Sequence, residues 1–176
     1  MQITGGKFNS RRLLSPKGDN VRPTLSKTRA AIFDVLFGYM EFGGKSFLDL
    51  FAGSGIMGLE AVSRGFEKSF AIEKDKKTFF NIKANYELLG LKPNVILGDS
   101  IKKIAAMSEK FDVIYVDPPY RLGLYEPALK EIKKNNVLND GGIIVVEHPD
   151  DEKIDFSEFK IVKQKTYGYK VITFLQ

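Results

Sequence analysis

Apolar runs and amphipathic stripes alternate along this chain in a regular order. Short runs rich in β-branched or aromatic residues, bounded by Gly, Asp or Pro, predict strands at Ser46–Phe51, Ser69–Glu73, Asn94–Leu97, Phe111–Val116 and Gly142–Glu147. Helical patterns lie between them, at Ile56–Arg64, Asp75–Leu89, Ser100–Met107 and Leu124–Asn135. This alternation predicts an α/β domain whose mostly parallel sheet is covered by helices on both faces.

The last part of the chain has a different pattern. Apolar and polar residues alternate in Phe159–Lys165 and in Tyr169–Leu175, on either side of Gly168. The pattern predicts two strands joined by a tight turn and paired antiparallel. They bring the sheet to seven strands, with an antiparallel strand at its C-terminal end.

The first part of the chain precedes this alternation. Gln2–Thr4 and Arg12–Leu14 flank a glycine pair and predict a small hairpin. Thr24 is expected to cap a first helix. The apolar stripe of that helix consists of Ala30, Ile32, Phe33, Leu36 and Phe37. We therefore expect an N-terminal arm at residues 1–24, followed by a domain at residues 25–176.

Charge is unevenly distributed along the 176 residues. The net charge is +5, but residues 1–30 alone hold seven basic residues and one acidic residue, a net charge of +6. The other 146 residues have a net charge of −1. A basic segment of this kind is expected to contact a polyanion such as nucleic acid, and a solvated tail is the alternative.

Composition excludes several kinds of chemistry. The chain has no cysteine and one histidine, which argues against disulfides, thiolate metal sites, histidine-rich metal sites and cysteine or histidine-based catalytic triads. No apolar run approaches the roughly 20 residues of a membrane span, and the N-terminus lacks the apolar core of a signal peptide. We expect a cytoplasmic, monomeric protein without a metal site and without a membrane partner.

A glycine-rich segment follows the first predicted strand and opens the next helix. Gly53, Gly55 and Gly58 match the pattern G-x-G-x-x-G, and Glu73 lies 20 residues after Gly53. This spacing is typical of dinucleotide-binding proteins, in which glycines let the backbone approach the ligand and the acid binds a ribose. A nicotinamide-dependent dehydrogenase is therefore one candidate.

Asp49 favours a different cofactor. This residue lies inside the predicted strand, where a buried carboxylate needs a partner that a cationic cofactor tail would supply. The segment Asp-Leu-Phe-Ala-Gly-Ser-Gly at Asp49–Gly55 resembles the first motif of S-adenosylmethionine-dependent methyltransferases, whose cofactor carries an ammonium and a sulfonium. The resemblance implies that Asp49, Gly53, Ser54 and Gly55 bind S-adenosyl-L-methionine.

Two further acids follow the next predicted strands. Glu73 ends one strand and Asp99 follows another, so both are expected at the carboxyl edge of the sheet, where ligands bind. Resemblance to the methyltransferase fold assigns Glu73 to the ribose hydroxyls of the cofactor, and Asp99 with Ser100 to its adenine end. Asp99 also precedes a predicted helix, and an N-cap role is compatible with this assignment.

The most specific motif is Asp117-Pro118-Pro119-Tyr120, directly after the fourth predicted strand. It resembles the catalytic motif of methyltransferases that act on exocyclic amino groups of nucleobases and on some amides. A base amine is a poor nucleophile because its lone pair is delocalised into the ring. If Asp117 and the Pro118 carbonyl accept its N–H bonds, the nitrogen becomes more tetrahedral, and the two prolines hold these acceptors rigidly. Tyr120 then offers a stacking surface to a base extruded from its helix.

Nearly the whole chain resembles the RsmD family, bacterial methyltransferases that modify the exocyclic amine of one guanine in small-subunit ribosomal RNA. Besides the core motifs, the resemblance rests on Ile3-Thr4-Gly5-Gly6, Arg11-Arg12-Leu13, Val21-Arg22-Pro23-Thr24, Tyr125 and the strand that contains Glu147. One position departs from the family: Ala30 follows Arg29 where the family usually has Glu. The resemblance implies a Rossmann-like class I methyltransferase fold.

The implied activity is S-adenosylmethionine-dependent methylation of a guanine N2 amine in 16S ribosomal RNA, with the RNA or an assembling small subunit as partner. The RNA-binding residues expected are Arg11, Arg12, Arg22 and Thr24. Because 176 residues leave no room for a separate recognition domain, specificity is expected from the arm and the RNA shape. The alternatives are methylation of an adenine N6 amine in DNA or RNA, and a non-catalytic RNA-binding module.

Overall fold

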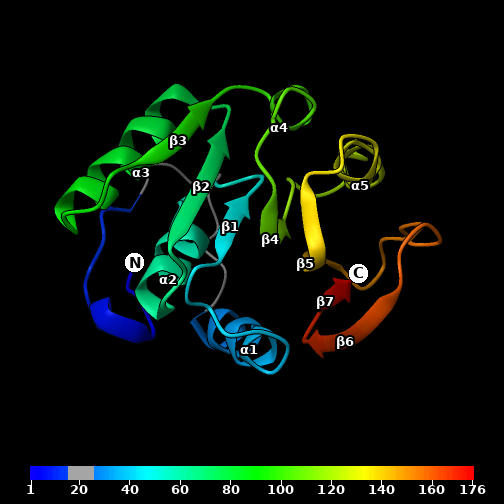
Figure 1. The fold of residues 1–176 in the computed structure, drawn as a ribbon, viewed down its shortest axis with the longest axis horizontal. Helices are drawn as coiled ribbons and strands as arrows, with labels where there is room; N and C mark the ends of the chain where they lie inside the picture. Colours follow the sequence, from blue (N-terminus) through cyan, green and yellow to red (C-terminus); the bar gives the residue numbers. More distant parts are fainter. Residues whose placement is uncertain (16–25) are drawn as a thin grey trace.

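A single seven-stranded sheet carries helices on both of its faces (Figure 1). The computed structural model describes residues 1–15 and 26–176. The strands are β1 (Ser46–Asp49), β2 (Lys68–Glu73), β3 (Asn94–Leu97), β4 (Phe111–Val116), β5 (Leu138–Pro149), β6 (Ile161–Tyr167) and β7 (Lys170–Leu175). The helices are the 3-10 turn η1 (Gly6–Phe8), α1 (Ser26–Phe37), α2 (Ile56–Arg64), α3 (Lys76–Leu88), α4 (Ser100–Ile104) and α5 (Tyr125–Lys134).

The strand order is β3-β2-β1-β4-β5-β7-β6. Strands β1 to β5 pair in parallel, and β7 runs antiparallel to both of its neighbours, β5 and β6. The central strand β1 has β2 on one side and β4 on the other, so the order of the strands reverses there. In open α/β sheets, ligands bind at the carboxyl edge of such a switch point. The predicted fold class, with its antiparallel C-terminal strand, is confirmed.

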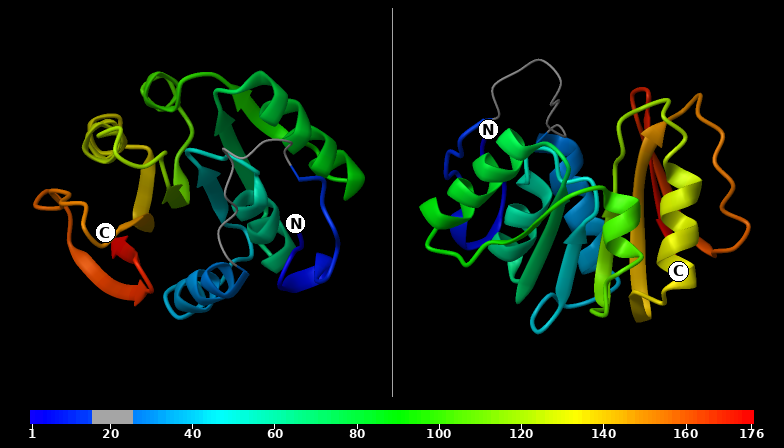
Figure 2. Two further views of the ribbon diagram at one scale, coloured as in Figure 1. Left: turned by 180° about the vertical axis from the view of Figure 1, so that it is seen from behind. Right: turned by 90° about the horizontal axis from the view of Figure 1, so that it is seen from above.

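Two apolar clusters fill the space between the sheet and its helices. On one face, α1, α2 and α3 contribute buried side chains such as Ile32, Met57 and Tyr86. On the other face, α4 and α5 contribute Ile104 and Leu129. Figure 2 shows these two layers of helices from behind and from above. Because both faces are covered, the central strands are apolar throughout rather than alternating.

Most element boundaries lie within two residues of the predicted ones. Strand β5 is longer, since it already begins at Leu138, which pairs with Phe111 of β4. Helix α4 ends at Ile104 rather than at Met107. Phe37, the last residue of the predicted apolar stripe of α1, is 68% exposed. The expected cap of this helix, Thr24, lies outside the described residues.

The N-terminal segment packs against the domain. Gln2 and Arg12 form an isolated antiparallel bridge. Ile3 and Leu13, each next to one of these residues, are buried in the cluster shared with α1, α2 and α3. The two ends of the segment are thus held side by side by one bridge and by the apolar core.

Buried polar contacts attach this segment to α2. Glu60 is fully buried and accepts hydrogen bonds from the N–H of Thr4 at 2.9 Å and from its hydroxyl at 2.6 Å. The same carboxylate forms an ion pair with buried Arg29 of α1. Gly6 has a φ of +75°, and a Cβ at this position would lie 1.8 Å from the carbonyl oxygen of Ser63. The glycine pair of the sequence motif is therefore where the segment touches α2.

Among residues 1–15 and 26–176, no helix combines the length and the hydrophobicity that a membrane crossing requires. The longest helix in this part of the chain, α3, has 13 residues, against the roughly 20 of a membrane span.

Candidate active site

The predicted site residues gather at the carboxyl edge of β1, β2 and β4. Asp49 at the end of β1 is in register with Ala71 of β2 and with Tyr115 of β4. Glu73 ends β2, and Asp117 directly follows β4. The two motifs that sequence analysis assigned to cofactor and to catalysis thus emerge from neighbouring strands at the switch point of the sheet.

The glycine loop needs its three glycines for two different reasons. Gly53 and Gly55 have φ values of +52° and +74°, a backbone region that other residues rarely adopt. A Cβ at Gly58 would lie 2.5 Å from the hydroxyl of Ser69, so this glycine allows close packing of α2 on β2. The loop therefore places the first turn of α2 directly beside the end of β1.

Glu73 links this loop to β2. Its Oε2 accepts a hydrogen bond from the N–H of Gly53 at 2.8 Å, and its Oε1 accepts one from the N–H of Asp75 at 2.7 Å. Burial raises the pKa of Glu73, while these two N–H donors act in the opposite direction. A carboxylate held in this way is fixed in place and keeps lone pairs for a further donor.

Asp49 is 1% exposed, and its Oδ1 has no hydrogen-bond partner among the described residues. Burial, followed by the negative charge of Glu73, raises the pKa of Asp49 to about 8. A buried carboxylate with an unpartnered oxygen is costly unless a ligand supplies the donor. A cationic group such as the ammonium of S-adenosylmethionine fits this position in charge and in hydrogen bonding.

Asp99 and Ser100 lie between β3 and α4. Asp99 is exposed, and its side chain accepts a hydrogen bond from the N–H of Lys102 at 3.0 Å, which makes it the N-cap of α4. Ser100 is buried. Asp99 thus caps α4, as the sequence predicted. The contact of Asp99 and Ser100 with the cofactor stays a prediction.

The Asp-Pro-Pro-Tyr motif forms the loop after β4. Asp117 and Tyr120 are half-buried, Pro118 is buried and Pro119 is exposed. Burial, followed by the negative charge of Glu147, raises the pKa of Asp117 well above its usual value. Asp49 contributes to the same increase, which indicates that the two predicted sites share one electrostatic environment.

Two buried charged residues from β5 and β7 complete the site. The ammonium of Lys170 pairs with Oε1 of Glu147, and Oε2 of the same carboxylate accepts a hydrogen bond from Tyr115 at 2.6 Å. The Tyr115 hydroxyl also lies 3.5 Å from Oδ2 of Asp117. No role for Lys170 is predicted from the sequence. One feature of the sequence could have indicated a role for this residue: it is a lysine at the start of β7, a strand that is otherwise apolar apart from Thr173.

Three other residues near this loop have mainly structural contacts. Tyr125, which is buried, donates a hydrogen bond to the carbonyl oxygen of Glu147 at 3.1 Å. His148 is buried, with one ring nitrogen 2.8 Å from the carbonyl oxygen of Pro149. Arg121 is exposed and pairs with Asp151. Of the three, only Arg121 faces solvent beside the motif.

The predicted RNA-binding residues are only partly described. Arg11 and Arg12 are exposed on the N-terminal segment. Arg22 and Thr24 lie outside the described residues. The contact of these four residues with RNA stays a prediction.

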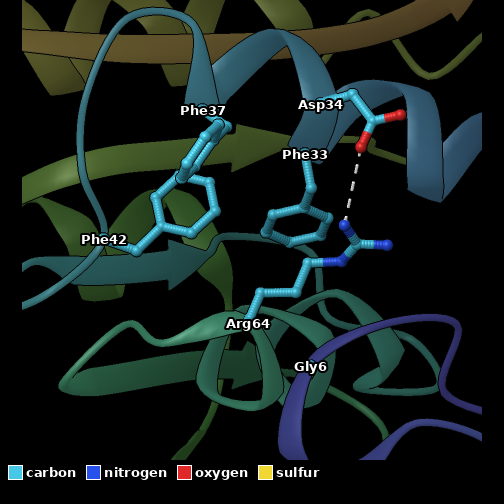
Figure 3. Close-up of a pocket in the computed structure, with 6 residues that line it drawn as sticks. All are labelled: Gly6, Phe33, Asp34, Phe37, Phe42 and Arg64. Atoms are coloured by element: carbon cyan, nitrogen blue, oxygen red, sulfur yellow. Dashed lines mark ion pairs between the residues drawn. The ribbon is translucent and has the colours of Figure 1, made fainter.

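A separate concavity lies between the N-terminal segment and α1 (Figure 3). Its walls include Phe33, Phe37 and Phe42, and the guanidinium of Arg64 lies over the ring of Phe33, 5.2 Å from its centroid. Arg64 also pairs with Asp34 at 3.6 Å. No residue predicted to bind cofactor or to act in catalysis lines this groove.

Within the described residues, no group of three or more His, Asp or Glu side chains is arranged to hold a metal ion. The acidic residues at the sheet edge are Asp49 and Glu73, which are both buried and influence each other's charge, and Asp117 and Glu147, which also influence each other's charge.

A sheet of this order, with a glycine loop after β1 and acids at the ends of β1 and β2, defines a class I methyltransferase. The model of the family Conserved hypothetical protein 95 matches residues 1–176. The chain belongs to this family, which is the RsmD family of the sequence resemblance.

Individual relatives agree with this assignment. Bacillus subtilis YlbH is 33% identical over 177 residues, which cover 96% of this chain and 94% of that protein. Ribosomal RNA small subunit methyltransferase D of Haemophilus influenzae is 30% identical over 174 residues, covering 96% and 89% of the two chains. The solved structure of Escherichia coli yhhF superimposes with a TM-score of 0.88 at 28% identity, covering 100% of this chain and 97% of the other.

Proposed function

We propose that this protein transfers a methyl group from S-adenosylmethionine to the exocyclic N2 amine of a guanine in small-subunit (16S) ribosomal RNA. One observation carries the proposal: the buried Oδ1 of Asp49, which has no hydrogen-bond partner in the described part of the chain, lies at the same sheet edge as the Asp117-Pro118-Pro119-Tyr120 loop. The name ribosomal RNA small subunit methyltransferase D, carried by relatives that cover most of the chain, supports the substrate class.

The cofactor would be held by the edge of β1, β2 and β3. When bound, S-adenosylmethionine supplies an activated methyl group on a sulfonium. Asp49 would pair with its ammonium, and Glu73 would use its remaining lone pairs for the ribose hydroxyls. The backbone of Gly53, Ser54 and Gly55 would line the cofactor, with Asp99 and Ser100 at its adenine end.

The loop after β4 would activate the base. The carboxylate of Asp117 and the carbonyl of Pro118 accept the two N–H bonds of the amine, which frees the nitrogen lone pair from the ring. Neither proline carries an N–H, and both restrict the backbone, so these acceptors keep their positions. The ring of Tyr120 stacks on the extruded base, a contact worth about 1–3 kcal/mol. Orientation of the amine accounts for much of the rate enhancement.

The N-terminal segment would hold the RNA. Arg11 and Arg12 are exposed while the segment itself is anchored to α2 through Thr4 and Gly6, so their charges have a fixed position relative to the domain. Contacts of these arginines with phosphates are independent of sequence and depend on salt. Arg22 and Thr24 would border the entrance to the site. We place the reaction in the cytoplasm, on the RNA or on an assembling small subunit, with the enzyme acting as a monomer.

The test uses cofactor with a labelled methyl group. Unmodified small subunits, naked 16S ribosomal RNA and duplex DNA are each incubated with the protein, digested to nucleosides and analysed by mass spectrometry. We expect label in N2-methylguanosine. Label in N6-methyladenosine from RNA, or in N6-methyldeoxyadenosine from DNA, would replace the proposal with the adenine alternative. No transfer to any of the three substrates would overturn it.

A variant tests the assignment of the loop. Asp117→Ala is expected to reduce turnover by at least 100-fold while cofactor binding is retained, because the residue would contact the amine and not the cofactor. Asp151→Ala, which removes an exposed carboxylate near the same loop, serves as the matched control and should keep full turnover. Unchanged turnover in Asp117→Ala would contradict the mechanism.

A further inference from the structure

Like its partner Glu147, Lys170 is a buried charged residue at this sheet edge to which the proposed function gives no role. It is 7% exposed and begins β7, opposite Pro149 of β5. Its ammonium pairs with Oε1 of Glu147, a side chain with 0% exposure. Burying two such groups is costly, and an apolar pair of similar size is often at least as stable. A contribution to stability therefore does not by itself explain why Lys170 and Glu147 are both buried here.

The pair faces the catalytic loop. The ammonium of Lys170 lies over the ring of Tyr120, 5.7 Å from the ring centroid. One face of this ring is thus occupied by the cation. A base that stacks on Tyr120 can use only the other face.

The pair also reaches Asp117. Tyr115 donates to Oε2 of Glu147 and lies 3.5 Å from Oδ2 of Asp117, so Lys170, Glu147, Tyr115 and Asp117 form a chain of contacts. Within residues 1–15 and 26–176, the ionisable groups that influence Asp117 come from five neighbouring elements and from its own loop. They are Asp49 of β1, Tyr115 of β4, Tyr120 of its own loop, Tyr125 of α5, Glu147 of β5 and Lys170 of β7.

Only Lys170 among these groups carries a positive charge. We propose that Lys170 is a positioning residue of the active site, which fixes the ring of Tyr120 through its ammonium and, anchored by Glu147, places a positive charge beside the Asp117 carboxylate. This inference rests on the proposed function and deepens it, because Asp117 accepts the amine N–H bonds best as an anion.

The positive charge of Lys170 lowers the pKa of Asp117. Burial alone would lower the pKa of Lys170, but the charge of Glu147 raises it above its usual value, so the ammonium persists over the whole working range of pH. Burial and Glu147 raise the pKa of Asp117, and Lys170 opposes them. Removing the ammonium must therefore raise the pKa of Asp117 further and leave less of its carboxylate ionised at neutral pH.

The experiment measures the titration of Asp117 directly, by carboxyl ¹³C NMR of the protein without cofactor or RNA. Lys170→Met is expected to raise the pKa of Asp117 by about one unit, and Lys170→Arg should keep the wild-type value. Lys165→Met, which removes an exposed lysine from β6, is the control and should also keep it. An Asp117 titration in Lys170→Met that matches the wild type overturns the proposal.

Methyl transfer to RNA supplies a second readout. In Lys170→Met the acid limb of the turnover-pH profile should move to higher pH by the same amount, whereas a merely structural role would lower turnover equally at all pH values. The double variant Glu147→Gln/Lys170→Met removes both buried charges. This double variant should fold even if Lys170→Met does not, because it leaves no buried charge without a partner. The acid limb of its turnover-pH profile should return toward the wild-type position. A double variant whose limb lies higher than that of Lys170→Met contradicts the proposal.

The two proposals fail in different ways. Because the NMR titration needs neither substrate nor cofactor, an unchanged Asp117 overturns the role of Lys170 even when the wild type is active. A wild-type protein that methylates no RNA overturns the proposed function, whatever the titration gives.

Discussion

The backbone N–H of Gly53 donates a hydrogen bond to Oε2 of Glu73 across 2.8 Å, and so joins the loop after β1 to the end of β2. The other oxygen of Glu73 accepts the N–H of Asp75 at 2.7 Å, at the start of α3. One buried carboxylate therefore holds two loops in place. If Glu73 binds the cofactor as proposed, its contribution would include the shape of the glycine loop as well as its own contact with the ribose.

Glu73→Gln should weaken binding of S-adenosylmethionine by roughly tenfold or more, because an amide accepts from one of the two N–H groups and turns its own NH₂ toward the other. Isothermal titration calorimetry measures this effect. Glu87→Gln, an exposed change on α3, is the control and should bind as the wild type does. Wild-type affinity in Glu73→Gln would show that the carboxylate is not needed to order the loop.

Asp49→Asn should raise the stability of the ligand-free protein, in a way that depends on pH. The pKa of Asp49 is about 8 in the folded protein, against about 3.9 for an unfolded aspartate. The unfolded chain therefore loses this proton first, and the free energy of unfolding falls as the pH rises from about 4 to about 8. The substitution removes this loss, so wild type and variant should be equally stable near pH 4 and differ most near pH 8.

Denaturant unfolding at the two pH values measures this difference, with the exposed Asp140→Asn as control. The same substitution should weaken binding of S-adenosylmethionine by at least tenfold, because the cofactor ammonium loses its anionic partner. A variant that is more stable and binds less well is the expected exchange of stability for function. Equal cofactor affinity in Asp49→Asn would place the ammonium elsewhere.

Gly55→Ala should destabilise the protein by about 2–3 kcal/mol. The φ of +74° strains any other residue, and a Cβ at this position would lie 2.8 Å from Cγ2 of Ile82. Gly90→Ala separates these two effects, because Gly90 has a φ of +69° with nothing within 4 Å of the added Cβ. It should cost only about 1 kcal/mol, as expected from strain alone. Equal midpoints of denaturant unfolding for the two variants would mean that α3 makes room for the added methyl group.

The sequence predicted the parallel part of the sheet because strands buried on both faces are continuous apolar runs, such as Phe111–Val116. It also placed Asp49, Glu73 and Asp117 at one edge, since in a parallel sheet the residue that ends each strand determines which edge it occupies. The early start of β5 at Leu138 was missed because Asn139, Asp140 and two glycines follow it, a pattern typical of a turn.

Two features of the site could not be predicted because they depend on contacts between distant parts of the chain. The pairing of Glu147 with Lys170 results from the antiparallel register of β5 and β7, which periodicity alone does not define. The basic N-terminal segment was predicted from its charge and from a hairpin pattern, neither of which shows what the segment packs against. The structure adds that Thr4, Glu60 and Gly6 attach it to α2, so its described part is anchored to the domain.

This anchoring determines how the RNA contact is tested. Arg11→Gln/Arg12→Gln should weaken binding of 16S ribosomal RNA and make the slope of log K against log salt less steep, by about 0.7 for each phosphate that is no longer neutralised. The affinity for S-adenosylmethionine should not change, because both side chains are exposed on a segment that packs against α2 and not at the edge of β1.

The matched control for this test is Lys68→Gln/Lys92→Gln. It lowers the net charge by the same amount, with two exposed lysines near the amino ends of β2 and β3, opposite the proposed site. If RNA binding follows total charge, both double variants lose equal affinity and the N-terminal segment has no special role. If the segment holds the RNA, only the arginine variant changes the salt slope. A loss of cofactor affinity in the arginine variant would instead show that this segment supports the cofactor site.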